Sequence, residues 1–264
     1  MFIFIATALA AWGVNVVGHT LFPSQNFVPF CVRSAITLGT DVAIIYTSFR
    51  LLVQSGLPQG ALGLAFSKKA ILDIVWGGMI GAIAVAMIAG MLFVFVPYHF
   101  VSGSLGISAA SKEVVSYVVG NLLEELIFRG FLFVIFSQLV GWRISALILA
   151  IPFGLFHLQG TGISIDGLKM VATTACYSFV FSFSYVFFRS LWAATSVHVM
   201  SNTCLHVITG LDGENKALLA PTFDRNWPTN YDPGFTVMIL TAVTVAALLY
   251  FAVESSDKYN RSRT

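Results

Sequence analysis

Three charged residues lie within one apolar segment of the sequence, NLLEELIFRG, which contains Glu124, Glu125 and Arg129. A charge at the centre of a membrane-spanning helix costs roughly 2.5–3.5 kcal/mol, so charged residues there are functional candidates. Glu125 and Arg129 are four residues apart, which predicts an ion pair on one helix face. Glu124 points about 100° away around the helix axis. Because one arginine neutralises one carboxylate, Glu124 is left as a candidate general base.

Two later apolar segments carry a histidine with a partner four residues away. FGLFH places Phe153 and His157 at this spacing, and HVMSN does the same for His198 and Asn202. Residues four apart share a helix face. A single histidine is more often a hydrogen-bonded core residue, so the candidate site depends on the whole set. His206 lies one step further along the second face and is left out of the predicted site.

The four polar groups could share one level inside a helical bundle. Counted at about 1.5 Å per residue, they lie about 12 to 22 Å from the expected helix ends. A carboxylate and a histidine can deprotonate water while other donors stabilise an oxyanion, which is the chemistry of hydrolysis. Glu124, His157 and His198 could instead bind Zn²⁺, which accepts both ligand types and keeps one position for water. Asn202 is a poor zinc ligand, so an oxyanion role is expected for it in either scheme. For Glu125 and Arg129, a purely structural ion pair is the stronger interpretation.

The composition predicts that these residues are positioned by membrane helices. Hydrophobic residues make up 57% of the 264 residues and charged residues only 10%, compared with about 25% charged residues in soluble domains. Lipid cannot satisfy unpaired backbone groups, so the fold class is expected to be all-α, a polytopic transmembrane bundle. One span needs about 20 apolar residues, and the hydropathy indicates about eight spans, the fifth of them short for a full crossing. The expected spans are 2–22, 30–53, 71–97, 113–139, 144–158, 168–188, 190–209 and 235–253.

Particular segments give further expectations within this bundle. Gly77, Gly81 and Ala84 give the third span a face suited to close helix contact. The run FVFSFSYVFF, residues 179–188, is interpreted as lipid-facing helix. The longest polar stretch, residues 210–234, contains three prolines and is predicted to be a loop.

The chain is expected to form a single integral membrane domain over residues 1–264 with both termini in the cytoplasm. The apolar N-terminus has no Lys or Arg before Arg33, so it is interpreted as the first span rather than a cleaved leader. Basic residues favour the side that carries the termini, by eight to five. The eight are Arg50, Lys68, Lys69, Arg143, Arg189, Lys258, Arg261 and Arg263, and the five are Arg33, Lys112, Lys169, Lys216 and Arg225. The net charge of +2 does not indicate nucleic acid as a partner.

Taken together and in this order, EExxxR, FxxxH and HxxxN on successive membrane helices resemble the CAAX-protease and bacteriocin-processing membrane proteins, the CPBP or Abi family. The resemblance implies an all-helical intramembrane protease with its motif-bearing core at about 113–209. It implies that Glu124 and His157 activate water and that His198 and Asn202 stabilise the oxyanion. The other motif residues, Glu125, Arg129 and Phe153, would support them.

The family resemblance leaves the mechanism and the substrate open. Both a zinc mechanism and a metal-free glutamate mechanism are compatible with the motifs, so the cofactor is either none or Zn²⁺. The expected partners are the lipid bilayer and a prenylated or other membrane-associated peptide, and a prenylated CAAX protein would lose its C-terminal tripeptide. In a prokaryote the compartment would be the cell membrane. The main alternative is a non-catalytic immunity or scaffold protein of the same family. A small proton- or ion-coupled transporter is a third reading, but the sequence has no repeated halves of the kind transporters show.

Overall fold

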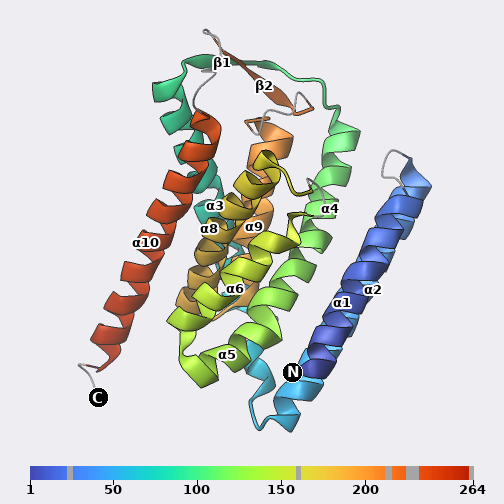
Figure 1. The fold of residues 1–264 in the computed structure, drawn as a ribbon, viewed down its shortest axis with the longest axis vertical. Coiled ribbons are helices and arrows are strands. Elements are labelled where there is room, and N and C mark those ends of the chain that lie inside the picture. Colours follow the sequence, from blue (N-terminus) through green and yellow to red (C-terminus); the bar gives the residue numbers. More distant parts are fainter. Residues whose placement is uncertain (23–25, 159–161, 212–215, 224–231, 262–264) are drawn as a thin grey trace.

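A computed structural model of the chain describes residues 1–22, 26–158, 162–211, 216–223 and 232–261. These residues form a bundle of helices with a small sheet at one end (Figure 1). The α-helices are α1 (Phe2–Leu21), α2 (Phe27–Gln54), α3 (Lys68–Phe95), α4 (Ile107–Glu125), α5 (Leu132–Val140), α6 (Trp142–Phe156), α8 (Ile165–Phe188), α9 (Leu191–Asn202) and α10 (Pro233–Arg261). Shorter turns are the 3₁₀ turn η1 (Gln59–Leu62) and the π-helical turns η2 (Leu126–Phe131) and η3 (Thr203–Ile208).

The predicted all-α membrane bundle is confirmed, because helix covers each of the eight expected spans. Within the described residues, four helices are long and apolar enough to cross a bilayer: α2, α3, α8 and α10. Phe2–Gly18 of α1 and the whole of α6 are apolar but shorter. The short fifth span therefore matches the expectation, and the number of full crossings stays a prediction.

The fourth predicted span is not one straight helix. α4 passes into the π-helical turn η2, where Gly130 has a non-helical ψ of −122°, and α5 continues in a new direction (Figure 1). A π turn inserts one extra residue per turn and is a recognised cause of sharp helix kinks. The kink follows Glu124 and Glu125 directly, so it lies beside the candidate site.

The glycine face of α3 makes the predicted close helix contact, and its partner is α9. A Cβ atom built on Gly77 would lie 2.4 Å from the carbonyl oxygen of Ala193, and one built on Gly81 would lie 2.5 Å from that of Val197. Only glycine allows the two backbones to approach so closely. Because α9 carries His198, this contact fixes one wall of the site.

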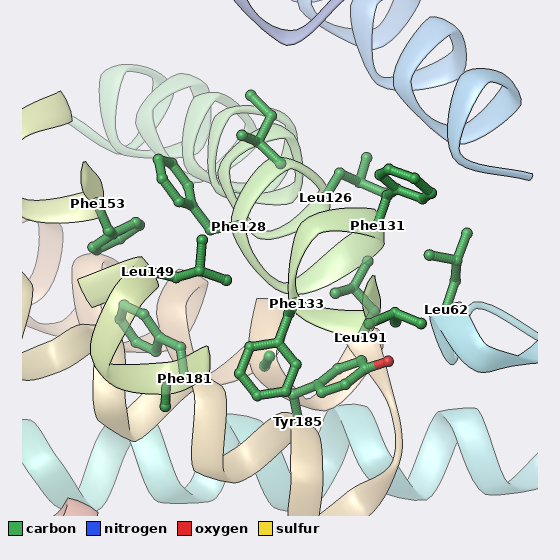
Figure 2. Close-up of a cluster of buried hydrophobic side chains, with 14 of the residues drawn as sticks. Leu62, Leu126, Phe128, Phe131, Phe133, Leu149, Phe153, Phe181, Tyr185 and Leu191 are labelled. Carbon is green, nitrogen blue, oxygen red and sulfur yellow. The ribbon is translucent and has the colours of Figure 1, made fainter. Parts of the chain in front are cut away.

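Large apolar side chains from η2, α5, α6 and α8 fill the centre of the bundle (Figure 2). The cluster corrects the interpretation of residues 179–188 as lipid-facing. Phe181 is 3% exposed and Tyr185 8%, and the three other buried side chains of the run are Val180, Ser182 and Ser184. The run is hydrophobic all round, so composition alone cannot tell a helix facing lipid from one facing protein.

A two-stranded antiparallel sheet covers the end of the bundle opposite the start of α1 and the end of α10 (Figure 1). Strand β1 (Tyr98–Ser102) follows α3, and β2 (Leu219–Phe223) lies within the stretch 210–234. Tyr98 pairs with Phe223, and Ser102 with Leu219. The prediction of a loop over this stretch is therefore wrong for β2, while 212–215 and 224–231 lie outside the described residues. Strands that pair across more than a hundred residues leave no local sequence signal.

Candidate active site

The candidate general base lies between the two predicted site histidines. Glu124 Oε2 is 3.7 Å from His157 Nε2 and 4.0 Å from His198 Nε2. The three side chains come from α4, from the residue that ends α6, and from α9. Both separations exceed direct hydrogen-bond length and suit a bridging water. Side chains predicted from three separate motifs thus converge on one carboxylate oxygen.

His157 is oriented by the backbone of its own helix. Its Nδ1 lies 2.9 Å from the carbonyl oxygen of Phe153, one turn earlier. A carbonyl only accepts hydrogen bonds, so Nδ1 carries the hydrogen and, in the neutral ring, Nε2 presents its lone pair. That lone pair is on the side of Glu124. The FxxxH spacing therefore fixes both the tautomer and the direction of the ring.

His198 has a different partner, because its Nδ1 lies 2.9 Å from Oε1 of Glu125. The same oxygen accepts a hydrogen bond from Arg129 Nη1 at 3.3 Å, which is the ion pair predicted within the helix. Glu125 and Arg129 are fully buried, and His198 is 4% exposed. Glu125 thus orients the histidine and compensates Arg129 at the same time, a link the sequence did not predict.

Arg129 is held on all sides by protein. Its Nη2 donates to both the carbonyl oxygen and the hydroxyl of Ser178, at 3.0 and 2.7 Å. The guanidinium carbon lies 4.2 Å from the ring centroid of Phe153 and 5.2 Å from that of Phe181, distances at which a cation is attracted to an aromatic face. Figure 2 shows Phe153 and Phe181 entering the same region from different helices. This arrangement ties η2 to α8.

Two residues near the site were missed by the sequence reasoning. Asn121 Oδ1 accepts a hydrogen bond from Asn202 Nδ2 at 3.4 Å, and Asn121 is 4% exposed. Its signal was its position four residues before Glu125 in the same apolar segment. Phe181 stacks on His198 with ring centroids 4.3 Å apart. That contact had no signal, because Phe181 lies in the run interpreted as lipid-facing.

The site opens into a cavity of about 600 Å³ between α3, α8, α9 and the start of α10. His157, His198 and Asn202 line this cavity, and so does His206, which the prediction left out. Most of the remaining wall is apolar or aromatic, which is typical of a pocket for a small or extended apolar ligand. Its apolar and aromatic residues are Val85, Ile88, Phe153, Met170, Tyr177, Phe181, Leu205, Leu211, Phe223, Phe235 and Met238.

The arrangement of Glu124, His157 and His198 does not reproduce a closed metal site. Among the residues that the structure describes, no group of three or more His, Cys, Asp or Glu side chains is placed to hold a metal ion. Nitrogen and oxygen ligands about 2.0–2.2 Å from one tetrahedral Zn²⁺ lie roughly 3.3–3.6 Å apart, slightly closer than the 3.7 and 4.0 Å between Glu124 Oε2 and the two histidine Nε2 atoms. Whether the site uses no cofactor or Zn²⁺ stays a prediction.

Comparison with known proteins supports the family read from the three motifs. Residues 107–204 match the family of type II CAAX prenyl endopeptidases, Rce1-like. This segment contains every motif residue from Glu124 to Asn202, so the resemblance to the CPBP proteases is confirmed over the part that carries it. The chain is also 30% identical over 90 residues to the "Putative membrane peptidase YdiL" of Bacillus subtilis (strain 168). That match spans 34% of each chain, about a third of the relative's length. Together with its apolar helices, the match identifies the chain as an integral membrane protein.

Proposed function

We propose that this chain is an intramembrane endopeptidase that hydrolyses a peptide bond of a membrane-associated substrate. One observation carries the proposal: a single oxygen of Glu124 lies within 4.0 Å of the Nε2 atoms of both His157 and His198. The two histidines line the cavity, and Glu124 lies behind them. A water held by this carboxylate and the His157 lone pair is positioned for general-base attack on a carbonyl carbon. The family match over the same segment supports the reading.

The reaction proceeds through a tetrahedral intermediate. Glu124 takes the proton of the attacking water and afterwards gives it to the leaving amine. His198 and Asn202 are the proposed oxyanion donors. With Nδ1–H directed at Glu125, His198 must be an imidazolium to donate from Nε2. Glu125 holds the Nδ1 side of His198 and is itself held by Arg129, so both residues act through His198 rather than on the substrate.

The substrate class we propose first is a prenylated protein that ends in CAAX and loses its C-terminal tripeptide. The matched family is named for this activity. The apolar cavity beside the site supports it, because three residues of apolar character fit a pocket of this size and lining. Other membrane-associated peptides, including bacteriocin precursors, are the alternatives within the family.

The orientation of the protein in the membrane distinguishes these substrate classes, because it decides from which side a substrate reaches the site. The excess of basic residues, eight to five, predicts cytoplasmic termini, whereas the CAAX proposal requires the opposite orientation. The site cavity reaches β2 and the start of α10, so it opens at the opposite end of the bundle (Figure 1). With cytoplasmic termini the substrate enters from the outer side, whereas a cytoplasmic CAAX tail requires the reverse. Single cysteines at the exposed positions Ser102 and Ser256, labelled in sealed vesicles of known sidedness, decide between the two.

The proposed activity is tested by cleavage of a fluorogenic farnesylated CAAX peptide with detergent-purified protein. Glu124→Gln is expected to lower the rate by about 10²- to 10⁴-fold without lowering the yield of folded protein. Glu254→Gln, a matched change near the end of α10, is expected to keep full activity. Retained activity in Glu124→Gln would remove the proposed base. Loss of wild-type activity in a zinc chelator, restored by Zn²⁺, would establish the metal mechanism instead. A well-folded wild type that cleaves no membrane peptide would favour the immunity or scaffold alternative.

A further inference from the structure

The cavity has a charged end as well as a catalytic end. Lys169 on α8 and Asp232 before α10 both line it, and Lys169 Nζ lies 2.7 Å from Asp232 Oδ2. The two side chains are 34% and 35% exposed. Of the Lys and Arg residues in the described chain, Lys169 alone belongs to the lining. The cavity therefore offers a negatively charged ligand one cationic contact.

The carboxylate of Asp232 forms an ion pair with Lys169, and a second hydrogen bond fixes the position of this carboxylate. Asp232 Oδ1 also accepts a hydrogen bond from the backbone N–H of Phe235 at 3.0 Å, which caps the start of α10. A second acid, Asp166, is 3.6 Å from Lys169 Nζ, but its side chain is 86% exposed. Water screens a charge at that exposure, so Asp166 competes only weakly for Lys169. Asp232 is the only close carboxylate partner that an incoming anion must replace among the described residues.

The distance from Lys169 to the catalytic end matches a short peptide. Lys169 and Phe181 are twelve residues apart on α8, about 18 Å along its axis, and Phe181 stacks on His198. α9 runs antiparallel to α8, and Asn202 lies one turn, about 6 Å, from His198 toward the Lys169 end. The axial gap between the levels of Asn202 and Lys169 is therefore about 12 Å. Three extended residues span about 10–11 Å, and the lysine stem covers the remainder.

We propose that Lys169 binds the free C-terminal carboxylate of the substrate, which replaces Asp232 as its partner and sets the cut three residues from the chain end. This inference rests on the proposed peptidase function and adds its selectivity for a chain end. One carboxylate replaces another on Lys169, so the exchange keeps the lysine charge compensated. An amidated or internal peptide segment brings no such charge and leaves the Lys169–Asp232 pair intact.

The test measures binding of an apolar tripeptide, Val-Ile-Met, as the free acid and as the C-terminal amide. Full-length Glu124→Gln protein in detergent is used, so that binding is read without turnover. The acid is expected to bind about 2- to 5-fold tighter than the amide, the range for one ion pair at this exposure. Lys169→Met should remove this preference, and Lys169→Arg should keep it, which guards against misfolding of the Met variant. Asp232→Asn should tighten binding of the acid by removing its competitor.

Lys68→Met serves as the charge-matched control, because Lys68 is exposed at the start of α3 and outside the cavity lining. Equal binding of acid and amide, or a preference that survives in Lys169→Met, would overturn the proposal. Cleavage by the wild type distinguishes failure of the Lys169 proposal from failure of the proposed peptidase function. Equal kcat/KM on acid and amide peptides would keep the peptidase and discard the role of Lys169. If wild type cleaves neither peptide, the peptidase function fails for that substrate, and the binding experiment still decides the role of Lys169.

Discussion

Nδ1 of His198 lies 2.9 Å from Oε1 of Glu125, although the two residues are 73 positions apart in the sequence. This contact joins the second glutamate of EExxxR to the histidine of HxxxN. Arg129 shares the same carboxylate oxygen. The two motifs are therefore halves of one buried hydrogen-bonded unit, with Glu124 and His157 beside it.

The first prediction concerns the charge of Glu125. Glu125→Gln keeps an acceptor oxygen for His198 but removes the negative charge that faces Nδ1 of the ring. We expect kcat to fall by about 10- to 100-fold with KM nearly unchanged, since the effect acts on the transition state. Peptide cleavage by the folded, monodisperse fraction measures it. An unchanged kcat in that fraction would show that His198 does not act as a charged donor.

The second prediction concerns the fully buried Arg129. Arg129→Met leaves the carboxylate of Glu125 buried without a cation, which costs about 3–5 kcal/mol when one partner of a buried pair is removed. We expect a large loss of folded protein and a lower Tm in detergent. Arg129→Lys should rescue it poorly, because lysine lacks the planar fork that reaches Ser178 and stacks on Phe153. Arg50→Met, at an exposed position on α2, is the control and should leave Tm nearly unchanged.

The third prediction tests the contact between α3 and α9. In Gly81→Ala the new methyl group would lie 2.5 Å from the carbonyl oxygen of Val197, so α9 must shift. We expect a loss of about 1–3 kcal/mol in stability, as for overpacked cores, together with a lower kcat because His198 follows Val197. Gly90→Ala lies on the same helix with no atom within 4 Å of the new methyl group. It should stabilise the helix by about 0.5–1 kcal/mol, and thermal unfolding of the two variants separates packing from helix propensity.

The fourth prediction concerns the pH dependence of the Lys169–Asp232 pair. Partial burial raises the pKa of Asp232, but the hydrogen bonds from Lys169 and from the N–H of Phe235 outweigh it and hold the pKa below its ordinary 3.8. A lowered pKa in the folded state means that the pair stabilises the protein above the unfolded-state pKa. This contribution is lost as the pH falls through the lower folded-state value.

The magnitude is small because the pair is about one-third exposed, roughly 0.2–1 kcal/mol. The measurement is the difference in Tm between wild type and Asp232→Asn as a function of pH. The difference should be constant near neutral pH and shrink toward zero below about pH 3.8. Asp166, His157 and His206 line the same cavity and are present in both proteins. A difference that grows in acid would contradict the assigned direction.

Local rules were enough to predict the helices and the faces that carry polar residues or glycine, but not the buried face of α8. Low charge and long apolar runs exclude water as the main solvent, and the resulting all-α membrane bundle was confirmed. Spacing by four residues predicted the Glu125–Arg129 ion pair and the glycine face of α3, because such spacing puts side chains on one face of any α-helix. It also put Phe153 and His157 together, and the carbonyl of Phe153 indeed accepts from His157.

The tertiary structure alone decided which faces meet. The partner of Glu125, the contact of Asn202 with Asn121 and the stacking of Phe181 on His198 all join different helices. They depend on helix tilt, on the π-helical kink after Glu125 and on the close approach of α3 to α9. None of these can be inferred from the spacing of residues within one helix. The pairing of β1 with β2 belongs to the same class. The sequence by itself determined where the helices lie and which polar side chains share a helix face, because both follow from local composition and spacing. Packing between distant segments determined which apolar faces are buried and how the polar side chains combine into one site.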